Sequence, residues 1–215
     1  MNCRIIDIHT HIYPVALARR AMEVTGHEND DFKKLPIREN LLARMREAGV
    51  DLSVNLPVVS KPQNQGEVNR FAKEAARKNI IPFGGLHPDC ENVIEELEKL
   101  KDMDRKINEL GFPVLIHMGT ARIVRPYDLY PSGIRKILKF APDIPIIMAH
   151  MGSFCMMKNP NENLENLPEN VFIDTAMSAE LEEAGEFEEI IRRFGTNRVL
   201  YGSDFPYGTQ KAAIA

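Results

Sequence analysis

The chain has 215 residues, 44% of them hydrophobic, so it can bury a sizeable core as one domain. Its 27 basic and 31 acidic residues give a net charge of −4, which argues against nucleic-acid binding. No apolar run approaches the roughly 20 residues of a membrane-spanning helix, and the charged N-terminus is unlike a secretory signal. The three cysteines are too few and too scattered for a disulfide framework. We therefore expect a soluble, cytoplasmic globular protein.

Short β-branched runs alternate with amphipathic helical stretches along the chain. Several of these runs are almost continuously apolar, which is typical of strands that are buried on both faces of a parallel sheet. The predicted strands cover residues 4–9, 51–56, 80–86, 113–118, 145–150, 170–175 and 198–203.

Helices are predicted between these strands. The first begins after Pro36, keeps Leu41, Met45 and Ala48 at helical spacing, and ends at Gly49. A glycine at that point suits the left-handed conformation that commonly closes a helix. Sustained alternation of strands and helices indicates an α/β fold with a parallel sheet. The further predicted helices cover residues 64–78, 91–110, 130–140 and 183–194.

Such a sheet can take two forms, an open doubly wound sheet or a closed eight-stranded barrel. The Gly-rich phosphate turn of a dinucleotide-binding sheet is missing after the first strand, where His-Thr-His-Ile-Tyr-Pro stands instead. Chemistry contributed by the ends of several strands is typical of a barrel. We therefore predict a (β/α)8 TIM barrel, with residues 1–215 as a single domain.

Seven predicted strands are one fewer than this barrel requires, and its usual length is about 250 residues. After His87 there is room for a helix but no buried strand before the next apolar run. One explanation is a complete protein with one long helix over 91–110. We favour a second explanation, in which part of the barrel is absent from the chain, because a complete barrel that lacks a strand would expose a sheet edge. In that case the fourth strand, between about Leu100 and Lys106, and the end of the last helix, after Ala215, are absent from the chain.

Five of the six histidines lie at or just past the end of a predicted strand. His9 and His11 stand two residues apart at the end of the first strand, so an extended backbone points both imidazoles to the same side. His117 and His150 follow later strands, and Asp204 follows the last one. Imidazole and carboxylate groups suit zinc, and also iron, cobalt or manganese. The sequence therefore predicts a metal site built from the ends of several strands.

A catalytic metal keeps one position open for water and lowers the pKa of that water from about 15.7 to about 7. A carboxylate beside the water can accept its proton, so Asp204 can serve as both ligand and base. Structural alternatives remain open. His117 and His150 could be core histidines bonded to carbonyls, and Asp204 could cap a helix, since Ser-Asp before a proline suits a helix start. Asp7 could hold a ligand imidazole or pair with a cation.

Four segments together resemble the amidohydrolase superfamily: Asp7-Ile-His-Thr-His, Pro113-Val-Leu-Ile-His-Met-Gly, Ile147-Met-Ala-His-Met-Gly and Leu200-Tyr-Gly-Ser-Asp-Phe-Pro. The chain is similar to the amidohydrolase-2 branch of metal-dependent TIM-barrel hydrolases, which includes aminocarboxymuconate-semialdehyde decarboxylase. The resemblance implies that His9, His11, His117 and Asp204 are metal ligands. It also implies that His150 orients or activates the metal-bound water, or serves a second metal. Whether one or two ions bind stays open, because the fourth strand that bridges two metals in binuclear relatives has no counterpart here.

These features predict a metal-dependent hydrolase that attacks an amide, lactone or ester bond of a small molecule, with Asp204 and His150 as the catalytic residues. The alternative is a lyase that decarboxylates an unsaturated or aromatic carboxylic acid without oxidation, and a third interpretation is a metal-binding scaffold without activity. Zinc is the expected ion, with manganese, iron and cobalt as alternatives. The expected partner is a small-molecule substrate, with no nucleic acid and no membrane. The substrate and the oligomeric state stay open, a homodimer being among the alternatives.

Overall fold

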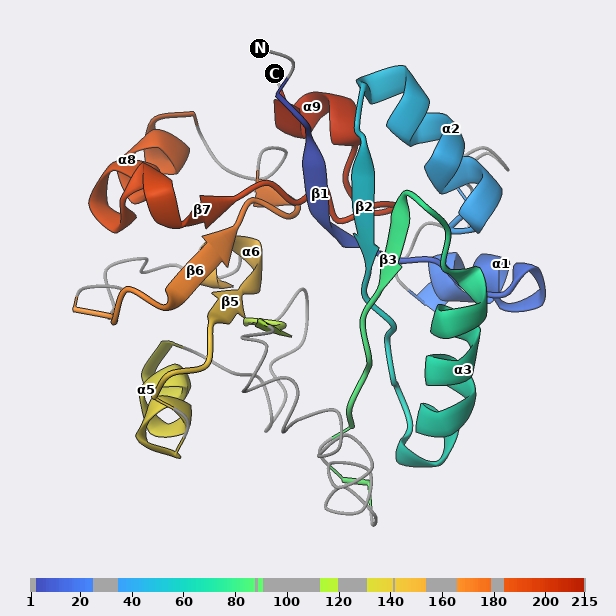
Figure 1. Ribbon diagram of the computed structural model, residues 1–215, viewed down its shortest axis with the longest axis horizontal. Helices are drawn as coiled ribbons and strands as arrows, with labels where there is room; N and C mark the ends of the chain where they lie inside the picture. Colours follow the sequence, from blue (N-terminus) through green and yellow to red (C-terminus); the bar gives the residue numbers. More distant parts are fainter. Residues whose placement is uncertain are drawn as a thin grey trace. The chain divides into compact units, whose positions relative to one another are not determined.

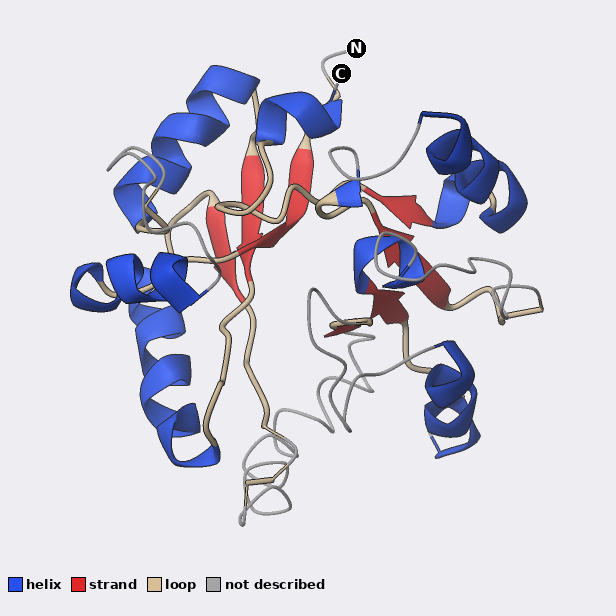
Figure 2. Ribbon diagram, turned by 180° about the vertical axis from the view of Figure 1, so that it is seen from behind, coloured by secondary structure: helices blue, strands red, loops and turns tan. Residues whose placement is uncertain are grey.

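A computed structural model of the protein describes residues 3–24, 35–87, 89–90, 113–119, 131–140, 142–153, 166–178 and 184–214. The chain forms two compact units, and each contains one parallel sheet flanked by helices (Figures 1 and 2). Unit 1 comprises Met1–Ile94 and Tyr201–Ala215, and unit 2 comprises Glu95–Leu200. None of the helices in the described ranges is long and apolar enough to cross a membrane.

Unit 1 contains a three-stranded parallel sheet in the order β1-β2-β3. Thr10 of β1 pairs with Asn55 of β2, and Asn55 pairs in turn with Pro82 of β3. The carboxyl ends of the three strands therefore lie at the same edge of the sheet. The register of β1 shifts between Asp7 and Thr10, so the strand is irregular where His9 lies. The strands are β1 (Ile6–Thr10), β2 (Leu52–Asn55) and β3 (Ile80–Pro82).

The helices of unit 1 bury apolar residues against this sheet. Leu41 and Met45 of α2 pack in one core cluster with Ile80 of β3 and with Phe205. As predicted, α2 ends at Gly49, which has a φ of 74° and donates its N–H to the Met45 carbonyl. The helices are α1 (Val15–Val24), α2 (Arg38–Ala48), the 3-10 turn η2 (Pro62–Asn64), α3 (Gln65–Ala75) and α9 (Gln210–Ile214).

The segment that re-enters unit 1 at Tyr201 lies alongside β1. The N–H of Ile8 donates to the Tyr201 carbonyl at 3.0 Å, and the N–H of His11 donates to the Phe205 carbonyl at 2.7 Å. Thr10 and Phe205 form an isolated parallel bridge. The first strand of the chain thus has the C-terminal segment as one neighbour and β2 as the other.

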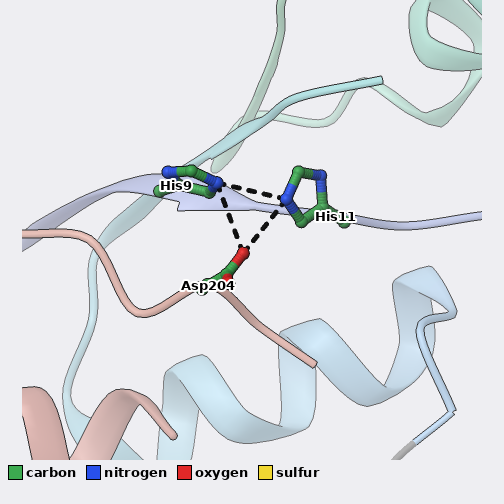
Figure 3. A group of neighbouring side chains, drawn as sticks. All are labelled: His9, His11 and Asp204. Carbon is green, nitrogen blue, oxygen red and sulfur yellow. Dashed lines mark hydrogen bonds and ion pairs between the residues drawn. The ribbon is translucent and has the colours of Figure 1, made fainter. Parts of the chain in front are cut away.

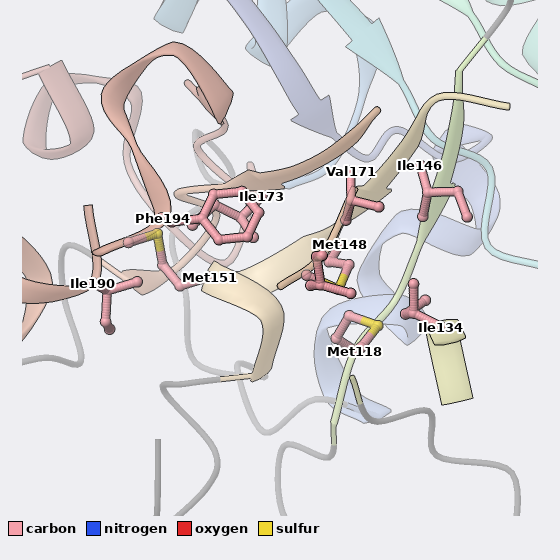
Figure 4. Packing of buried hydrophobic residues seen from close by; sticks show 10 residues of the cluster. Met118, Ile134, Ile146, Met148, Met151, Val171, Ile173, Ile190 and Phe194 are labelled. Carbon is pink, nitrogen blue, oxygen red and sulfur yellow. The ribbon is translucent and has the colours of Figure 1, made fainter. Parts of the chain in front are cut away.

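Unit 2 contains a four-stranded parallel sheet in the order β4-β5-β6-β7. Ile134 of α5 and Ile190 and Phe194 of α8 join the strand residues in one buried core, and their side chains are shown in Figure 4. The elements are β4 (Val114–Ile116), α5 (Pro131–Phe140), β5 (Ile146–Met148), α6 (Ala149–Ser153), β6 (Val171–Asp174), α8 (Ala184–Phe194), the 3-10 turn η4 (Thr196–Arg198) and β7 (Val199–Leu200).

All seven predicted strands are present, but each is shorter than predicted, and β3 and β7 lose the most residues. β3 ends at Pro82, and the backbone of Gly85 then bonds to the Asn69 side chain instead of a neighbouring strand. The helix α1 was not predicted. It follows Pro14, whose carbonyl accepts the N–H groups of the first turn, and it buries Ala18 and Met22. The predicted helix over 91–110 and the expected missing fourth strand fall outside the described residues.

Candidate metal centre

Three predicted ligands come together in unit 1. His9 lies within β1, His11 lies one residue beyond its end, and Asp204 lies in the C-terminal segment beside them (Figure 3). The two Nε2 atoms are 3.1 Å apart, and Oδ1 of Asp204 lies 3.3 Å from Nε2 of His9 and 3.1 Å from Nε2 of His11. Within the part of the chain that the structure describes, this is the group of His, Cys, Asp and Glu side chains that could hold an ion.

The triangle of donor atoms has the size of one face of a coordination polyhedron. At metal–ligand bonds of about 2.0–2.1 Å, neighbouring donors are about 3.3 Å apart around a four-coordinate ion and about 3.0 Å apart around a six-coordinate one. The observed edges of 3.1–3.3 Å match this range. Two imidazoles and a carboxylate also suit zinc and the neighbouring transition metals. The residues present therefore fit a divalent ion.

The backbone just beyond β2 fixes the orientation of the His11 ring. Nδ1 of His11 lies 2.7 Å from the carbonyl oxygen of Leu56. A carbonyl oxygen can only accept a hydrogen bond, so Nδ1 carries a proton, and in the neutral ring Nε2, which lies 3.1 Å from Oδ1 of Asp204, has the lone pair. A backbone carbonyl that holds the second nitrogen of a ligand imidazole is a common feature of metal sites, since it fixes the tautomer and the ring plane.

Asp204 is buried and has a left-handed backbone, with a φ of 61°. Aspartate tolerates this conformation better than most residues, but it still stores strain, and such residues concentrate at functional sites. Its N–H donates to the His9 carbonyl at 2.9 Å, and its own carbonyl accepts from the N–H groups of Tyr207 and Gly208. The alternative of a helix cap does not describe the carboxylate, which lies against both imidazoles.

Asp7 holds the backbone of the centre, and its side-chain partners among the described residues are backbone N–H groups, a hydroxyl and an amide. It is fully buried and accepts from the N–H of His9 at 3.2 Å. It also accepts from the N–H and hydroxyl of Ser203 at 3.0 and 2.6 Å and from the Gln210 amide at 2.7 Å. Burial raises the pKa of Asp7, and the bonds from Ser203 and Gln210 oppose that rise.

Two tyrosines lie beside the centre. Tyr13 and Tyr207 share a side-chain hydrogen bond, and the Tyr207 ring centroid is 6.1 Å from that of His11. Burial first, then Tyr207 and the charge of Asp204, raise the pKa of Tyr13, so the phenol stays protonated in neutral solution. Sequence reasoning missed Tyr207, although its place three residues after Asp204 was a usable signal.

The other two predicted site residues form a pair in unit 2. Nε2 of His150 lies 3.0 Å from Nδ1 of His117, and Nδ1 of His150 lies 3.1 Å from the Ala176 carbonyl. Because that carbonyl accepts, Nδ1 of His150 carries a proton. In the neutral pair Nε2 of His150 then accepts from Nδ1 of His117, and Nε2 of His117 carries the lone pair that a metal ligand requires.

A buried aspartate that was not predicted supports His150. The N–H groups of His150 and Ala176 both donate to Oδ1 of Asp174, at 2.9 and 3.1 Å. His150 itself has a left-handed backbone, with a φ of 57°, within the left-handed turn of α6. The position of Asp174 at the end of a predicted strand was the signal that could have identified it.

Comparison with solved structures shows the fold. A 5-carboxyvanillate decarboxylase from Sphingomonas paucimobilis matches with a TM-score of 0.61 and 15% identity, over 98% of this chain and 91% of that one. A probable 2-pyrone-4,6-dicarboxylic acid hydrolase from Acinetobacter baumannii matches with a TM-score of 0.60 and 15% identity, over 100% of this chain and 90% of that one. An amidohydrolase from Burkholderia multivorans with bound zinc matches with a TM-score of 0.59 and 13% identity, over 99% of this chain and 89% of that one. The matched proteins are TIM barrels, and the predicted fold class is confirmed.

No curated protein matches the chain. The family model described as amidohydrolase matches residues 101–215, which is more than half of the chain and includes His117, His150 and Asp204. The N-terminal residues His9 and His11 lie outside that match, but the structural likeness extends over them. The chain therefore belongs to the amidohydrolase family of enzymes.

Proposed function

We propose that the protein is a metal-dependent hydrolase that cleaves an amide, lactone or ester bond of a small molecule. The observation that carries the proposal is the triangle of His9, His11 and Asp204, whose donor atoms have the spacing of metal ligands. Membership of the amidohydrolase family supports the hydrolytic reaction. When bound, a divalent ion supplies a Lewis acid that polarises a carbonyl oxygen and acidifies water.

Within this proposal the chain's own residues hold the ion, orient the ligand rings and accept the proton. The His11 ring is held by the Leu56 carbonyl with its Nε2 lone pair toward the centre. Asp204 is the proposed proton acceptor, because its carboxylate lies at the centre and its backbone is locked by bonds to His9 and Tyr207.

The proposal adds His117 as a further ligand and His150 as the residue that steadies water or the developing oxyanion. The family resemblance suggests both roles. The hydrogen bond between the two rings supports them, because it assigns His117 the tautomer with an unprotonated Nε2. Asp174 and the Ala176 carbonyl hold the His150 backbone and ring, which is the support that a catalytic imidazole needs.

Zinc is the proposed ion, because the donor set suits it and a structural relative has zinc bound. Metal analysis of the purified protein tests this. We expect about one ion per chain after reconstitution, and a loss of zinc affinity of at least about 10²-fold in His11→Ala and Asp204→Asn. His87→Ala is the matched control, since His87 also follows a strand of unit 1 but lies outside the triangle. Wild-type protein without a stoichiometric divalent ion would contradict the proposal.

A second candidate is non-oxidative decarboxylation of an unsaturated or aromatic carboxylic acid. The likeness to 5-carboxyvanillate decarboxylase favours it, because the same fold carries that reaction there. Zinc-loaded protein should be tested on panels of esters, lactones, amides and aromatic acids. Hydrolysis that Asp204→Asn abolishes would support the first proposal. Release of carbon dioxide that His150→Ala abolishes would support the second, and bound zinc without turnover on any panel would indicate a scaffold.

A further inference from the structure

Asn55, the last residue of β2, is a fully buried amide. It pairs with Thr10, which lies between His9 and His11 in the chain. Its backbone carbonyl accepts from the N–H of Phe83, just beyond β3, at 3.0 Å. Asn55 is therefore held between the first and third strands at their carboxyl ends, which is where the predicted chemistry of this fold takes place.

The side-chain oxygen of Asn55 has a structural task that fixes the orientation of the amide. The N–H of Ile12, the residue after His11, donates to Oδ1 at 3.0 Å. Since a backbone N–H can only donate, the atom facing Ile12 must be the oxygen, and the NH2 group must be the other end. That NH2 group is buried and has no hydrogen-bond partner among the described residues. A buried donor without an acceptor is unfavourable, and such groups are rare in folded proteins.

Contacts of the neighbouring residues show which face of the sheet Asn55 occupies. Ser53, two residues earlier in β2, pairs with Asp7 of β1. Both lie against the Gln210 amide, whose Nε2 is 2.7 Å from Oδ2 of Asp7 and 3.4 Å from Oγ of Ser53. β2 runs in regular register with β3, so Asn55 points to the same face as Ser53. Asp7, on that face, also holds Ser203, which is adjacent to Asp204.

Another amide of unit 1 shows how a purely structural side chain is used here. Asn69 donates from Nδ2 to the Gly85 carbonyl at 2.9 Å and accepts from the Gly85 N–H at 2.7 Å. Both of its ends are therefore satisfied within the fold. Among the described residues Asn55 satisfies only its oxygen, which accepts from Ile12, and leaves two N–H donors on the face that carries Asp7.

We propose that Nδ2 of Asn55 donates a hydrogen bond to an acyl oxygen of the substrate, either a carbonyl or a carboxylate oxygen. This inference rests on the proposed function, since the substrate is held at the metal centre. Asn55 is then a substrate-binding residue that orients the acyl group beside the ligand imidazoles. The same amide links recognition to the centre, because its other end holds the backbone that follows His11.

The test measures binding of two probes, benzoate and benzamide, to the zinc-loaded protein by isothermal titration calorimetry. Asn55→Asp keeps an oxygen for Ile12 and removes only the donor. We expect this variant to retain zinc. Its affinity for benzoate should fall at least about 10-fold if the partner of Nδ2 is a carboxylate, or its affinity for benzamide at least about 3-fold if that partner is a carbonyl. Asn55→Ala, which introduces no buried charge, repeats the measurement in case the aspartate variant does not fold.

Gln65→Glu is the matched control. Gln65 is also a buried amide whose oxygen accepts a backbone N–H, that of His87 at 2.8 Å, and whose NH2 group has no partner among the described residues. We expect it to bind both probes as the wild type does. Unchanged affinity for both probes in the zinc-loaded Asn55 variants would overturn the inference, as would wild-type protein that takes up zinc but binds neither probe. Wild-type protein that takes up no zinc would instead overturn the proposed function, and the inference with it.

Discussion

Asp7 shows how a single residue can hold a metal centre without being a ligand. Its carboxylate accepts from the backbone N–H of His9 and from both the N–H and the hydroxyl of Ser203. These bonds fix the residues next to or within the two ligand-bearing segments. The remaining bond comes from the Gln210 amide. A carboxylate can accept about four hydrogen bonds, so its capacity is used entirely inside the fold.

Replacing Asp7 by alanine should destabilise the protein by about 3 kcal/mol or more, because the donors of Ser203 and Gln210 would be buried without an acceptor. Ser203→Ala removes the hydroxyl that donates to Asp7 and accepts from the N–H of Phe205, and it should cost about 2 kcal/mol. Urea denaturation of the two variants, followed by circular dichroism, measures both values. If the free energy of unfolding of Asp7→Ala lies within about 1 kcal/mol of the wild-type value, the network is not a main support of the centre.

At the scale of elements, one helix in each unit ends at a glycine with a positive φ. Gly49 closes α2 with a φ of 74°, and Gly195 follows α8 with a φ of 100° and donates to the Ile191 carbonyl. The sequence predicted both helix ends, the first at Gly49 and the second at residue 194. Glycine reaches the left-handed region without the steric penalty that a Cβ atom imposes, so each helix can stop and return its chain to the sheet.

Gly49→Ala should therefore lower the free energy of unfolding by about 1–2 kcal/mol, because alanine is strained at that φ even though an added Cβ meets no atom within 4 Å. Gly66→Ala is the matched control. Gly66 lies inside α3 without a positive φ, and its added Cβ also meets nothing within 4 Å. There the same change should raise the free energy of unfolding by roughly 0.5–1 kcal/mol, since alanine favours a helix. Chemical denaturation distinguishes the two signs, and equal effects would contradict the argument.

At the scale of the whole molecule, unit 1 is made from the two ends of the chain. The bond from Ser203 to Asp7 joins residues 196 positions apart, and Asp204 meets His9 and His11 across a similar separation. Closing so long a loop costs conformational entropy. An ion held by these three residues would cross-link the N-terminal strand and the C-terminal segment in the folded state alone.

Zinc should for this reason stabilise the entire chain. At a free zinc concentration 100 times the dissociation constant, the expected gain in the free energy of unfolding is about 2.7 kcal/mol. Thermal unfolding with zinc, and again after EDTA, measures the gain and its reversal. Asp204→Asn should show little of either effect. A wild-type melting temperature that zinc leaves unchanged would contradict a site formed by the native fold.

Much of the local structure could be read from the residues. The β-branched runs marked all seven strands, helical spacing and Gly49 marked α2, and the two-residue spacing of His9 and His11 placed both imidazoles on one side. Each of these follows from backbone periodicity over a few residues. The helix α1 was missed although its Ala, Leu, Arg and Met residues after Pro14 favour a helix, whereas the contacts of Ala18 and Met22 with Leu35 and Ile37 are seen only in the fold.

The sequence by itself determined an α/β fold of parallel strands and a set of strand-end histidines and Asp204 as ligand candidates. Only the tertiary structure placed Asp204 within 3.3 Å of both imidazoles. It also assigned Asp7 to the backbone of the centre and revealed the unsatisfied amide of Asn55. The physical reason is distance along the chain. Periodicity governs neighbours a few residues apart, whereas these contacts form between segments that meet only when the sheet of unit 1 assembles.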